Sequence, residues 1–354
     1  MSLTLFNGSY LGHRPTGIGV VARDLVAALN PGRVRLLDPL GGDRPNSIPI
    51  PATMAPEQGQ RGHWRRLLWL QSDLPQLMRC YGADLLLSPL PEAPLLRGVR
   101  SVVLAHDLLP LRHPQPTPLL AYHLSYVPLV LHRAERVLCN SEATAREVHR
   151  RLRVPIRKLV PIRLGFNPRH LHPMDLRREP FFLVLGRHDP HKNLSQVLRA
   201  LAALPDRSLQ LRLVGPHDRR YTPKLLRLAT ELGIAERCHW HSWVSDAERL
   251  DLLNRCQALV IASLWEGFGL PALEAMACGT SVIASRSGAL PEVLGDVGQL
   301  VNPRSVAEIS AAMAAVAGDG AMAAAARREG PARAATFNWV DTAREVEQLL
   351  AELA

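Results

Sequence analysis

The sequence predicts an α/β protein with two domains, each built from helices packed on a parallel sheet. Short apolar runs typical of buried parallel strands alternate with amphipathic, helix-length segments along most of the chain. At 354 residues, the chain exceeds the size at which one hydrophobic core keeps growing. A hydrophobic content of 47% with 5% aromatic residues indicates ordinary globular cores built mainly from Leu, Ala and Val.

The first half of the chain contains several runs with the composition of buried strands, and helical segments fall between most of them. These runs are residues 3–6, 34–37, 84–87, 101–104 and 136–139. Residues 1–8 lack the charged and apolar blocks of a signal peptide, so we expect the chain to begin with the first strand. Residues 39–62 are rich in Pro, Gly and polar side chains, which predicts a mobile excursion that shapes a substrate site.

The second half repeats the alternation of strands and helices up to about Val301. Prolines interrupt any periodic pattern within residues 167–180, where we expect a hinge. After the last strand, residues 307–326 predict an alanine-rich helix and residues 339–353 a final amphipathic helix. We therefore divide the chain into an N-terminal domain, residues 1–170, a C-terminal domain, residues 171–335, and a last segment, residues 336–354.

Cysteine and histidine usage argues against a disulfide framework or a metal site. The five cysteines are scattered, odd in number and without paired metal-ligand spacing, which indicates reduced core residues in a cytosolic protein. The sequence has fourteen histidines but no His-Glu-x2-His and no Asp-x-Asp motif, so we expect no metal cofactor. No apolar run reaches the roughly eighteen residues that a membrane-spanning helix needs.

A formal net charge of +10 calls for an anionic partner: a small-molecule substrate, a membrane surface or nucleic acid. No aromatic-interleaved RNA-binding signature or zinc finger is present, so we expect no sequence-specific nucleic-acid binding. Residues 61–70 combine cations with two tryptophans in a predicted helix, as segments that lie at a membrane surface do. The alternative is that this helix packs Leu67, Leu70 and Leu74 into the core and leaves its arginines in solvent.

A glycine-rich turn with two glutamates follows the apolar run at residues 256–262. Pro271 suits the first turn of a short helix and Gly279 its left-handed end. Glu274 then lies within the helix and Glu266 on the loop before it. The free N–H groups of the helix start favour an anion such as diphosphate, and ionised carboxylates accept hydrogen bonds from a sugar or ribose diol. The alternative is a loop and a helix with two solvated glutamates.

A basic loop, residues 186–193, follows another apolar run, residues 181–185, and precedes an amphipathic segment. Arg187 and Lys192 on this loop would neutralise a diphosphate, the arginine through its planar fork and the lysine as a mobile point charge. Asn193 is placed to cap the helix that follows. The alternative is that both cations are ordinary solvated surface side chains.

Several segments of the second half carry a resemblance to a known family. They are Gly186-Arg187-x4-Lys192-Asn193, residues 244–248, Glu266-Gly267-Phe268-Gly269-Leu270-Pro271-x2-Glu274 with Ala-Met-Ala-Cys-Gly after it, and residues 287–293. The first half adds a thinner set, residues 14–19, His106-Asp107 and residues 140–142. Together they resemble the retaining enzymes of glycosyltransferase family 4, over nearly the whole chain.

The resemblance implies the GT-B fold, in which two Rossmann-like domains face each other across a cleft. The N-terminal domain would bind the acceptor, the C-terminal domain would bind the nucleotide-sugar donor, and the last helix would cross back to the N-terminal domain. Arg187 and Lys192 would hold the donor diphosphate and Glu274 the donor ribose. Glu266 would hold the transferred sugar, helped by the backbone N–H groups of Gly267, Phe268, Gly269 and Leu270.

The family also implies roles for residues outside these two loops. Gly17 and Gly19 would form a loop over the phosphates, and the backbone around Val244 would contact the base. His106 would lie next to the donor sugar as a positioning group. The predicted catalytic residues are thus His106, Glu266, Arg187 and Lys192. Ser141 is better explained as the N-cap of the helix that begins at Glu142.

The implied reaction is departure of a nucleoside diphosphate from the anomeric carbon, with attack on the same face. Retaining hydrolases place a nucleophilic carboxylate at that carbon. The resemblance instead puts Glu266 at the sugar hydroxyls, so we expect no enzyme nucleophile, with the leaving phosphate oxygen taking the acceptor proton. Negative charge that develops on this phosphate would meet Arg187, Lys192 and the helix start.

Donor and acceptor are less constrained than the reaction. Residues 106–112 and the Gly17-Ile18-Gly19 loop look like those of mannosyltransferases in surface-polysaccharide assembly, which favours GDP-mannose as donor. UDP-linked glucose, galactose or N-acetylglucosamine, a GT-B epimerase or phosphorylase, and a non-catalytic membrane-attached protein are alternatives. We expect a glycan or lipid-linked acceptor and a cytoplasmic protein, peripheral on the inner membrane face if residues 61–70 touch lipid.

Overall fold

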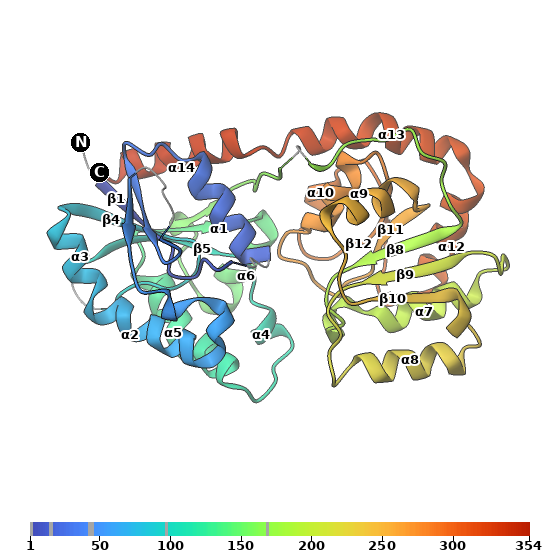
Figure 1. Cartoon of the computed structure of the whole chain (residues 1–354), viewed down its shortest axis with the longest axis horizontal. Helices are drawn as coiled ribbons and strands as arrows, with labels where there is room; N and C mark the ends of the chain where they lie inside the picture. The colour runs from blue at the N-terminus through green and yellow to red at the C-terminus, as the bar shows by residue number, and fades with distance from the viewer. Residues whose placement is uncertain (1–2, 14–16, 42–45, 96–97, 168–169) are drawn as a thin grey trace. The chain divides into compact units, whose positions relative to one another are not determined.

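A computed structural model describes residues 3–13, 17–41, 46–95, 98–167 and 170–354. The chain divides into two compact units, each a helix-covered sheet in which every strand pair is parallel (Figure 1). Unit 1 comprises Met1–Gly165 and Asn338–Ala354, and unit 2 comprises Phe166–Phe337. The predicted α/β class is confirmed.

Unit 1 contains a seven-stranded sheet in the order β3-β2-β1-β4-β5-β6-β7. The strands are β1 (Leu3–Asn7), β2 (Val34–Asp38), β3 (Ser47–Pro49), β4 (Ala83–Ser88), β5 (Arg100–Ala105), β6 (Arg136–Cys139) and β7 (Leu159–Pro161). All the strands predicted in this half are present. The short edge strands β3 and β7 were not predicted from the sequence. The strand order reverses between β1 and β4, so the loops after these two strands diverge at one point of the sheet edge.

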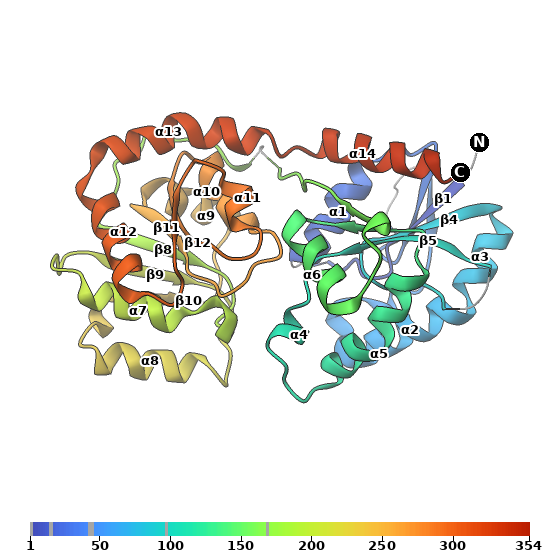
Figure 2. The ribbon, with the colours of Figure 1, turned by 180° about the vertical axis from the view of Figure 1, so that it is seen from behind.

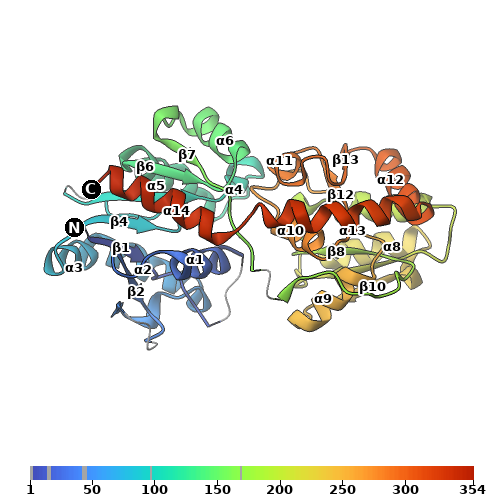
Figure 3. The same ribbon diagram turned by 90° about the horizontal axis from the view of Figure 1, so that it is seen from above.

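Helices cover both faces of the unit 1 sheet. They are α1 (Gly17–Ala28), α2 (Gly59–Ser72), α3 (Leu74–Cys80), α4 (Leu109–Arg112), α5 (Pro118–Arg133), α6 (Glu142–Leu152) and α14 (Trp339–Glu352). The last of these comes from the far end of the sequence and lies beside α1 (Figure 3). Two hydrogen bonds hold it there: the N–H of Asn30 donates to Glu347 at 2.6 Å, and the Thr342 hydroxyl donates to the carbonyl of Arg163 at 2.5 Å.

Unit 2 contains a six-stranded sheet in the order β10-β9-β8-β11-β12-β13. The strands are β8 (Phe181–Leu185), β9 (Gln210–Val214), β10 (Cys238–His241), β11 (Ala258–Ile261), β12 (Ser281–Ser285) and β13 (Gln299–Val301). The helices are α7 (Leu194–Ala203), α8 (Thr222–Glu231), α9 (Asp246–Arg255), α10 (Leu270–Ala277), α11 (Leu290–Leu294), α12 (Val306–Gly318) and α13 (Gly320–Ala335). Helix α7 packs against α8 and α12 on one face, and α10 packs against α9, α11 and α13 on the other (Figures 1 and 2).

Two predictions are wrong: the mobile excursion at residues 39–62 and the single helix at residues 307–326. Residues 47–62 do not form a loose excursion, because the buried side chains of Ile48, Ile50 and Met54 hold β3 and a 3-10 turn against the core; residues 42–45 lie outside the described residues. Residues 307–326 are not one helix. Asp319 ends α12 and accepts a hydrogen bond from the N–H of Ala321 at 2.8 Å, which caps a new helix, α13.

The helix predicted at residues 61–70 is present as α2, and its side chains divide between the two interpretations. Leu70 and Leu74 are fully buried in the unit 1 core and Leu67 packs against it. Contrary to the expectation of solvated arginines, the Arg66 side chain is also buried, where it pairs with Glu92. Trp64 remains 58% exposed. The helix therefore packs on the core through one face and presents an apolar side chain to solvent on another.

Cysteines and hydropathy add two observations. All five cysteines are free, and four are buried as expected, but Cys80 is exposed at the end of α3. Over the described ranges, no single helix is long and apolar enough to cross a membrane. The segments Val306–Gly318 and Gly320–Glu352 reach the required length and hydropathy only when counted together, with a bend of 91° between them.

Candidate functional site

The candidate site lies where the strand order of the unit 2 sheet reverses, between β8 and β11. Connections from β8 run outward to β9 and β10, whereas those from β11 run the other way to β12 and β13. Loops at such a point diverge and leave a crevice at the carboxyl ends of the strands, which is where open α/β sheets bind ligands. Both motifs singled out in the sequence are these two loops.

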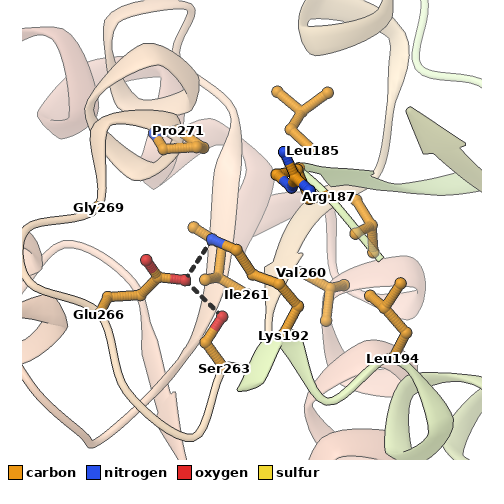
Figure 4. A pocket seen from close by; sticks show the side chains of 12 residues that line it. Leu185, Arg187, Lys192, Leu194, Val260, Ile261, Ser263, Glu266, Gly269 and Pro271 are labelled. Atoms are coloured by element: carbon orange, nitrogen blue, oxygen red, sulfur yellow. Dashed lines mark hydrogen bonds and ion pairs between the residues drawn. The ribbon is translucent and has the colours of Figure 1, made fainter. Parts of the chain in front are cut away.

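A small pocket occupies this crevice (Figure 4). Its walls come from the ends of β8 and β11, the two loops and the start of α10. The lining residues are Val184, Leu185, Gly186, Arg187, Lys192, Leu194, Val260, Ile261, Ser263, Glu266, Gly269 and Pro271. The structure therefore brings together Arg187, Lys192, Glu266 and Gly269, which the sequence predicted for one site.

Asn193 ties the two loops together. It sits in the left-handed region at φ 58° before α7, and its side chain makes no N-cap hydrogen bond, so the predicted capping role is wrong. Its amide instead donates to the carbonyls of Ala262 at 2.9 Å and Pro303 at 2.6 Å. The loop that carries Lys192 is thereby fixed to the end of β11, because one side chain satisfies two backbone carbonyls that would otherwise need other partners.

Lys192 and Glu266 form an ion pair in the pocket, with Nζ 2.7 Å from Oε1. The hydroxyl of Ser263 donates to the same oxygen at 2.5 Å, so Oε2 accepts neither of these bonds (Figure 4). Burial alone would raise the pKa of Glu266, but Lys192 and Ser263 outweigh it and bring the pKa below its usual value. The carboxylate is therefore ionised at neutral pH, and the pair keeps some solvent access, at 21% and 13% exposed.

Arg187 lies on the rim of the same pocket and is much more exposed, at 64%. Its Nε is 3.2 Å from a carboxylate oxygen of Asp189, two residues on. An exposed pair of this kind contributes little to stability. The guanidinium can thus exchange this partner for an anionic ligand at small cost.

Glycines shape the loop after β11. Gly269 has φ 110° at the start of α10, a conformation that other residues rarely adopt. Gly288, in the loop between β12 and α11, has φ 63°. A Cβ there would lie 2.2 Å from the carbonyl oxygen of Glu266, so only glycine lets this loop approach the loop after β11. The N–H of Ala289 donates to that same carbonyl at 3.0 Å. The backbone that carries Glu266 is therefore held against the loop that precedes α11.

Helix α10 begins at this loop with Leu270 and ends before Gly279. The predictions for Pro271 in its first turn and for a left-handed Gly279 at its end are confirmed. Gly267 and Phe268 are buried in the loop, and the Phe268 ring packs edge-on against Phe337. The N-terminus of α10 thus adds a positive dipole end to the pocket that holds Lys192.

Glu274, predicted for the ribose, lies on α10 but does not line the small pocket. Its Oε1 accepts a hydrogen bond from Nη1 of Arg249 on α9 at 2.8 Å. Burial raises the pKa of Glu274, while Arg249 acts in the opposite direction. Val244, predicted for the base, is half-buried just before α9, where Ser245 and Glu248 form a capping box that fixes the turn.

Two candidates of unit 1, Gly17 and Gly19, open helix α1. The other motif residues before them, Arg14, Pro15 and Thr16, lie outside the described residues. The role of the two glycines over the donor phosphates therefore stays a prediction.

His106 follows β5 and is half-buried. Its Nε2 is 2.8 Å from the carbonyl oxygen of Pro89, and burial lowers its pKa. The imidazole is therefore neutral at neutral pH, with Nε2 donating to that carbonyl. Ser141 accepts a hydrogen bond from the N–H of Thr144 at 3.0 Å, which confirms it as an N-cap.

Sequence reasoning missed two residues of the site, Ser263 and Arg249. Ser263 stands on the same turn as Glu266, three residues before it, and this spacing is the signal that could have indicated their contact. Arg249 belongs to no recognised motif, and nothing about an arginine in a helix indicates which carboxylate it meets. Among the described residues, no cluster of three or more His, Cys, Asp or Glu could hold a metal ion.

Two family models match the chain, one in each half. A model described as "Glycosyltransferase Family 4" matches residues 15–170, and one described as "Glycosyl transferases group 1" matches residues 175–333. The chain belongs to this glycosyltransferase family. The predicted family is thereby confirmed, and the second match spans both loops of the pocket.

Relatives of the chain include proteins named as mannosyltransferases. The chain is 35% identical over 195 residues to the MMP alpha-(1->4)-mannosyltransferase of Mycolicibacterium hassiacum, which covers 52% of the chain and 46% of that relative. It is 29% identical over 257 residues to the O-antigen chain mannosyltransferase B of Escherichia coli, which covers 68% of the chain and 67% of that relative. The chain thus spans about half the length of the first of these proteins.

Solved structures share the fold over the whole chain. Sucrose-phosphate synthase from Thermosynechococcus elongatus matches with a TM-score of 0.77 at 21% identity, covering 100% of this chain and 99% of that one. Anabaena HepE in complex with UDP-glucose matches with a TM-score of 0.76 at 19% identity, covering 99% and 100%. These likenesses confirm the predicted GT-B fold.

Proposed function

We propose that this protein transfers a sugar from a nucleotide-sugar donor to a glycan or lipid-linked acceptor, with retention of anomeric configuration. The observation that carries the proposal is the Lys192–Glu266–Ser263 arrangement beside the start of α10, at the switch point of the unit 2 sheet. The cation, the ionised carboxylate and the start of α10 all line one pocket. A sugar diphosphate needs these same groups.

Lys192 and Arg187 bind the donor diphosphate in this proposal. The ammonium of Lys192 already faces the pocket and needs only to share its contact with Glu266. Arg187 gives up its exposed pair with Asp189. As the sugar–phosphate bond breaks, negative charge grows on the leaving phosphate, and the two cations beside a helix N-terminus stabilise that charge more than they stabilise the ground state.

Glu266 orients the transferred sugar through its hydroxyls. Its Oε1 is occupied by Lys192 and Ser263, so Oε2 is the oxygen that can accept from a sugar hydroxyl. Because both partners keep the carboxylate ionised, it accepts hydrogen bonds rather than donating a proton. We therefore assign the acceptor proton to the leaving phosphate oxygen, and His106, neutral and bonded to Pro89, to positioning.

GDP-mannose is the donor that we propose, because the relatives at 35% and 29% identity are named as mannosyltransferases. A UDP-sugar is the alternative, favoured by the structural likeness to HepE with UDP-glucose. Binding of the nucleotide needs no metal in this proposal, since Lys192, Arg187 and the α10 N-terminus supply the positive charge.

A thermal-shift titration against UDP, GDP, ADP and their common sugar conjugates tests the proposal, with and without added magnesium. A ligand that binds only the folded state raises the melting temperature by mass action. We expect a selective shift with GDP and GDP-mannose that magnesium does not change. A selective shift with a UDP-sugar would overturn the donor and keep the reaction class, and no shift with any nucleotide would overturn the transferase proposal.

We also propose that unit 1 contacts an anionic membrane surface through the outer faces of α2 and α5. The two helices lie side by side (Figure 2). The rings of His63 on α2 and Tyr122 on α5 are 5.0 Å apart. Trp64 and Leu68 on α2 are 58% and 69% exposed, and Leu124 on α5 is 63% exposed. Exposed arginines flank the tryptophan on α2, as in helices that lie at a lipid interface.

Vesicle flotation tests this contact. The wild-type protein should float with vesicles that contain phosphatidylglycerol, and a Trp64→Ser, Leu68→Ser variant should remain largely in the soluble fraction. Vesicles of phosphatidylcholine alone serve as the charge control. Equal flotation of wild-type and variant proteins would contradict the assignment to this surface.

A further inference from the structure

Arg249 on α9 joins the glutamate that we assign to the donor ribose with the turn that we assign to the base. Its Nη1 donates to Oε1 of Glu274 at 2.8 Å, and its Nη2 lies 3.1 Å from a carboxylate oxygen of Asp246. Asp246 is the first residue of α9, two places after Val244. One guanidinium therefore spans the distance between α10 and the start of α9.

This contact occupies one oxygen of the Glu274 carboxylate and leaves the other oxygen for a ligand. Oε1 is held by Arg249, and the side chain of Glu274 is only 17% exposed, which restricts its rotamers. Because Arg249 donates to Oε1, Oε2 is the oxygen that can accept from a diol. A carboxylate already fixed in this way loses less conformational freedom when a ligand arrives.

Charge supports the same conclusion. Burial raises the pKa of Glu274, and Asp246 adds to the rise, while Arg249 opposes both. A protonated carboxyl group would lose acceptor capacity toward a diol. Arg249 thus favours the form of Glu274 that a ribose requires.

Arg255, on the same helix, is an arginine whose ion pairs have only a structural role, and it serves as a comparison for Arg249. It is 31% exposed, as Arg249 is, and it also bridges two carboxylates, Asp251 and Glu179. Its Nε is satisfied at 2.8 Å from Asp251, whereas the buried Nε of Arg249 has no partner in the described part of the chain. The two arginines therefore form a matched pair for experiment.

We propose that Arg249 is a positioning residue that holds Glu274 oriented toward the ribose hydroxyls of the donor nucleotide. The inference rests on the proposed function and deepens it, because it assigns part of the preference for ribose over deoxyribose to an arginine outside the recognised motifs. Arg249 itself touches neither the sugar that is transferred nor the phosphates in this arrangement.

Calorimetric titration of the full chain with GDP and with 2′-deoxyguanosine diphosphate tests the proposal, with UDP and its deoxy form as a second pair. The proteins are wild type, Arg249→Leu, Arg249→Lys and the control Arg255→Leu. Wild type should prefer the ribonucleotide by about tenfold or more, as expected for hydrogen bonds to a charged group. Arg249→Leu should reduce this preference to about threefold or less, mainly through weaker ribonucleotide binding, and Arg255→Leu should leave it unchanged.

The possible outcomes distinguish a failure of the role proposed for Arg249 from a failure of the proposed function. If wild type binds and Arg249→Leu keeps the full ribose preference, or loses equal affinity for both nucleotides, this inference is overturned and the proposed function stands. If wild type binds no nucleoside diphosphate, both are overturned. Should Arg249→Leu fail to fold, Arg249→Lys decides: a preference between those of wild type and the expected leucine variant supports the inference, and an unchanged preference overturns it.

Discussion

Each unit has a cation paired with a carboxylate beside the point where its strand order reverses. The two pairs differ in how deeply they are buried and in how many of their hydrogen bonds are made. In unit 1, Arg66 and Glu92 are 4% and 3% exposed, with Nε at 2.6 Å from Oε2 and Nη2 at 3.0 Å from Oε1. Nη1 of Arg66 also donates to the carbonyl of Met54, and the Tyr122 hydroxyl donates to Glu92. In unit 2, Lys192 and Glu266 share a single contact and remain partly open to solvent.

This contrast in burial and hydrogen bonding indicates that the Arg66–Glu92 pair stabilises the fold and that the Lys192–Glu266 pair is available to a ligand. A buried pair whose hydrogen bonds are made on both sides has nothing left to offer a substrate, and removing one partner leaves an uncompensated charge. A lysine has three donors, and Lys192 uses one of them on Glu266, so it keeps the capacity to bind an anion. Ion pairing alone therefore does not mark a site; unused hydrogen-bonding capacity does.

Breaking the buried Arg66–Glu92 pair should change the stability of the protein more than any other substitution considered. Arg66→Met should lower the free energy of unfolding by about 3–5 kcal/mol, because Glu92 would remain buried without its partner. Nucleoside-diphosphate affinity should stay within about twofold of wild type, since the proposed nucleotide site is in unit 2. Denaturant unfolding and calorimetric titration measure the two quantities. The double variant Arg66→Met, Glu92→Leu should recover most of the stability, and failure to do so would contradict the assignment of the loss to an unpaired charge.

Glu266→Gln should have the next largest effect, on turnover. The amide keeps the shape of the side chain but removes the charge that pairs with Lys192, and we expect turnover to fall about 100-fold, as for loss of one electrostatic contact at a reacting centre. Nucleoside-diphosphate affinity should change much less. Steady-state kinetics with the donor found by the thermal-shift screen measure the first quantity. Unchanged turnover would remove Glu266 from the site.

Lys192→Ala should weaken nucleoside-diphosphate binding by about tenfold, the value of one charge-assisted hydrogen bond. Lys224→Ala is the matched control, because this exposed lysine of α8 carries the same charge in the same unit. Calorimetry on both variants measures the effect. Equal losses in the two variants would show that net charge, rather than the pocket, attracts the nucleotide.

The smallest expected effect is a pH dependence of stability. The pKa of Glu266 lies below its usual value, so the ionised form is favoured by folding. Its contribution is present above the unfolded pKa of about 4.3 and is lost as the pH falls through the lower folded value. The melting-temperature difference between wild type and Glu266→Gln should therefore shrink between about pH 5 and pH 3. A difference that grows as the pH falls would contradict this sign.

Sequence reasoning predicted the fold class and placed Lys192 and Glu266 in one site for identifiable reasons. The buried strands of a parallel sheet are continuous apolar runs, and a loop that must approach a ligand needs glycine and cations close together in sequence. Lys192 and Glu266 therefore stand in short motifs that a linear sequence displays. Their direct contact with each other, seventy-four places apart, does not follow from either motif.

The errors came from side chains with more than one available partner. Asn193 had the right residue type and position for a cap, yet two carbonyls from other loops offered its amide better bonds. Arg66 lay in a run of arginines that looked solvated, and only the fold revealed that Glu92 lies beneath α2. Arg249 could not be assigned because its partner is twenty-five places away on another helix. Such choices depend on tertiary competition that a local pattern does not contain.

The membership of α14 in unit 1 bears on how the chain folds during synthesis. Unit 2 is one continuous stretch, Phe166–Phe337, whereas unit 1 needs residues from both sides of it. A ribosome releases residues in order, so unit 2 can close its own core as soon as it has emerged, while the surface of α1 that α14 covers must wait. Until α14 has emerged, the face of α1 that it covers lacks its partner, and unit 1 therefore reaches its final form last.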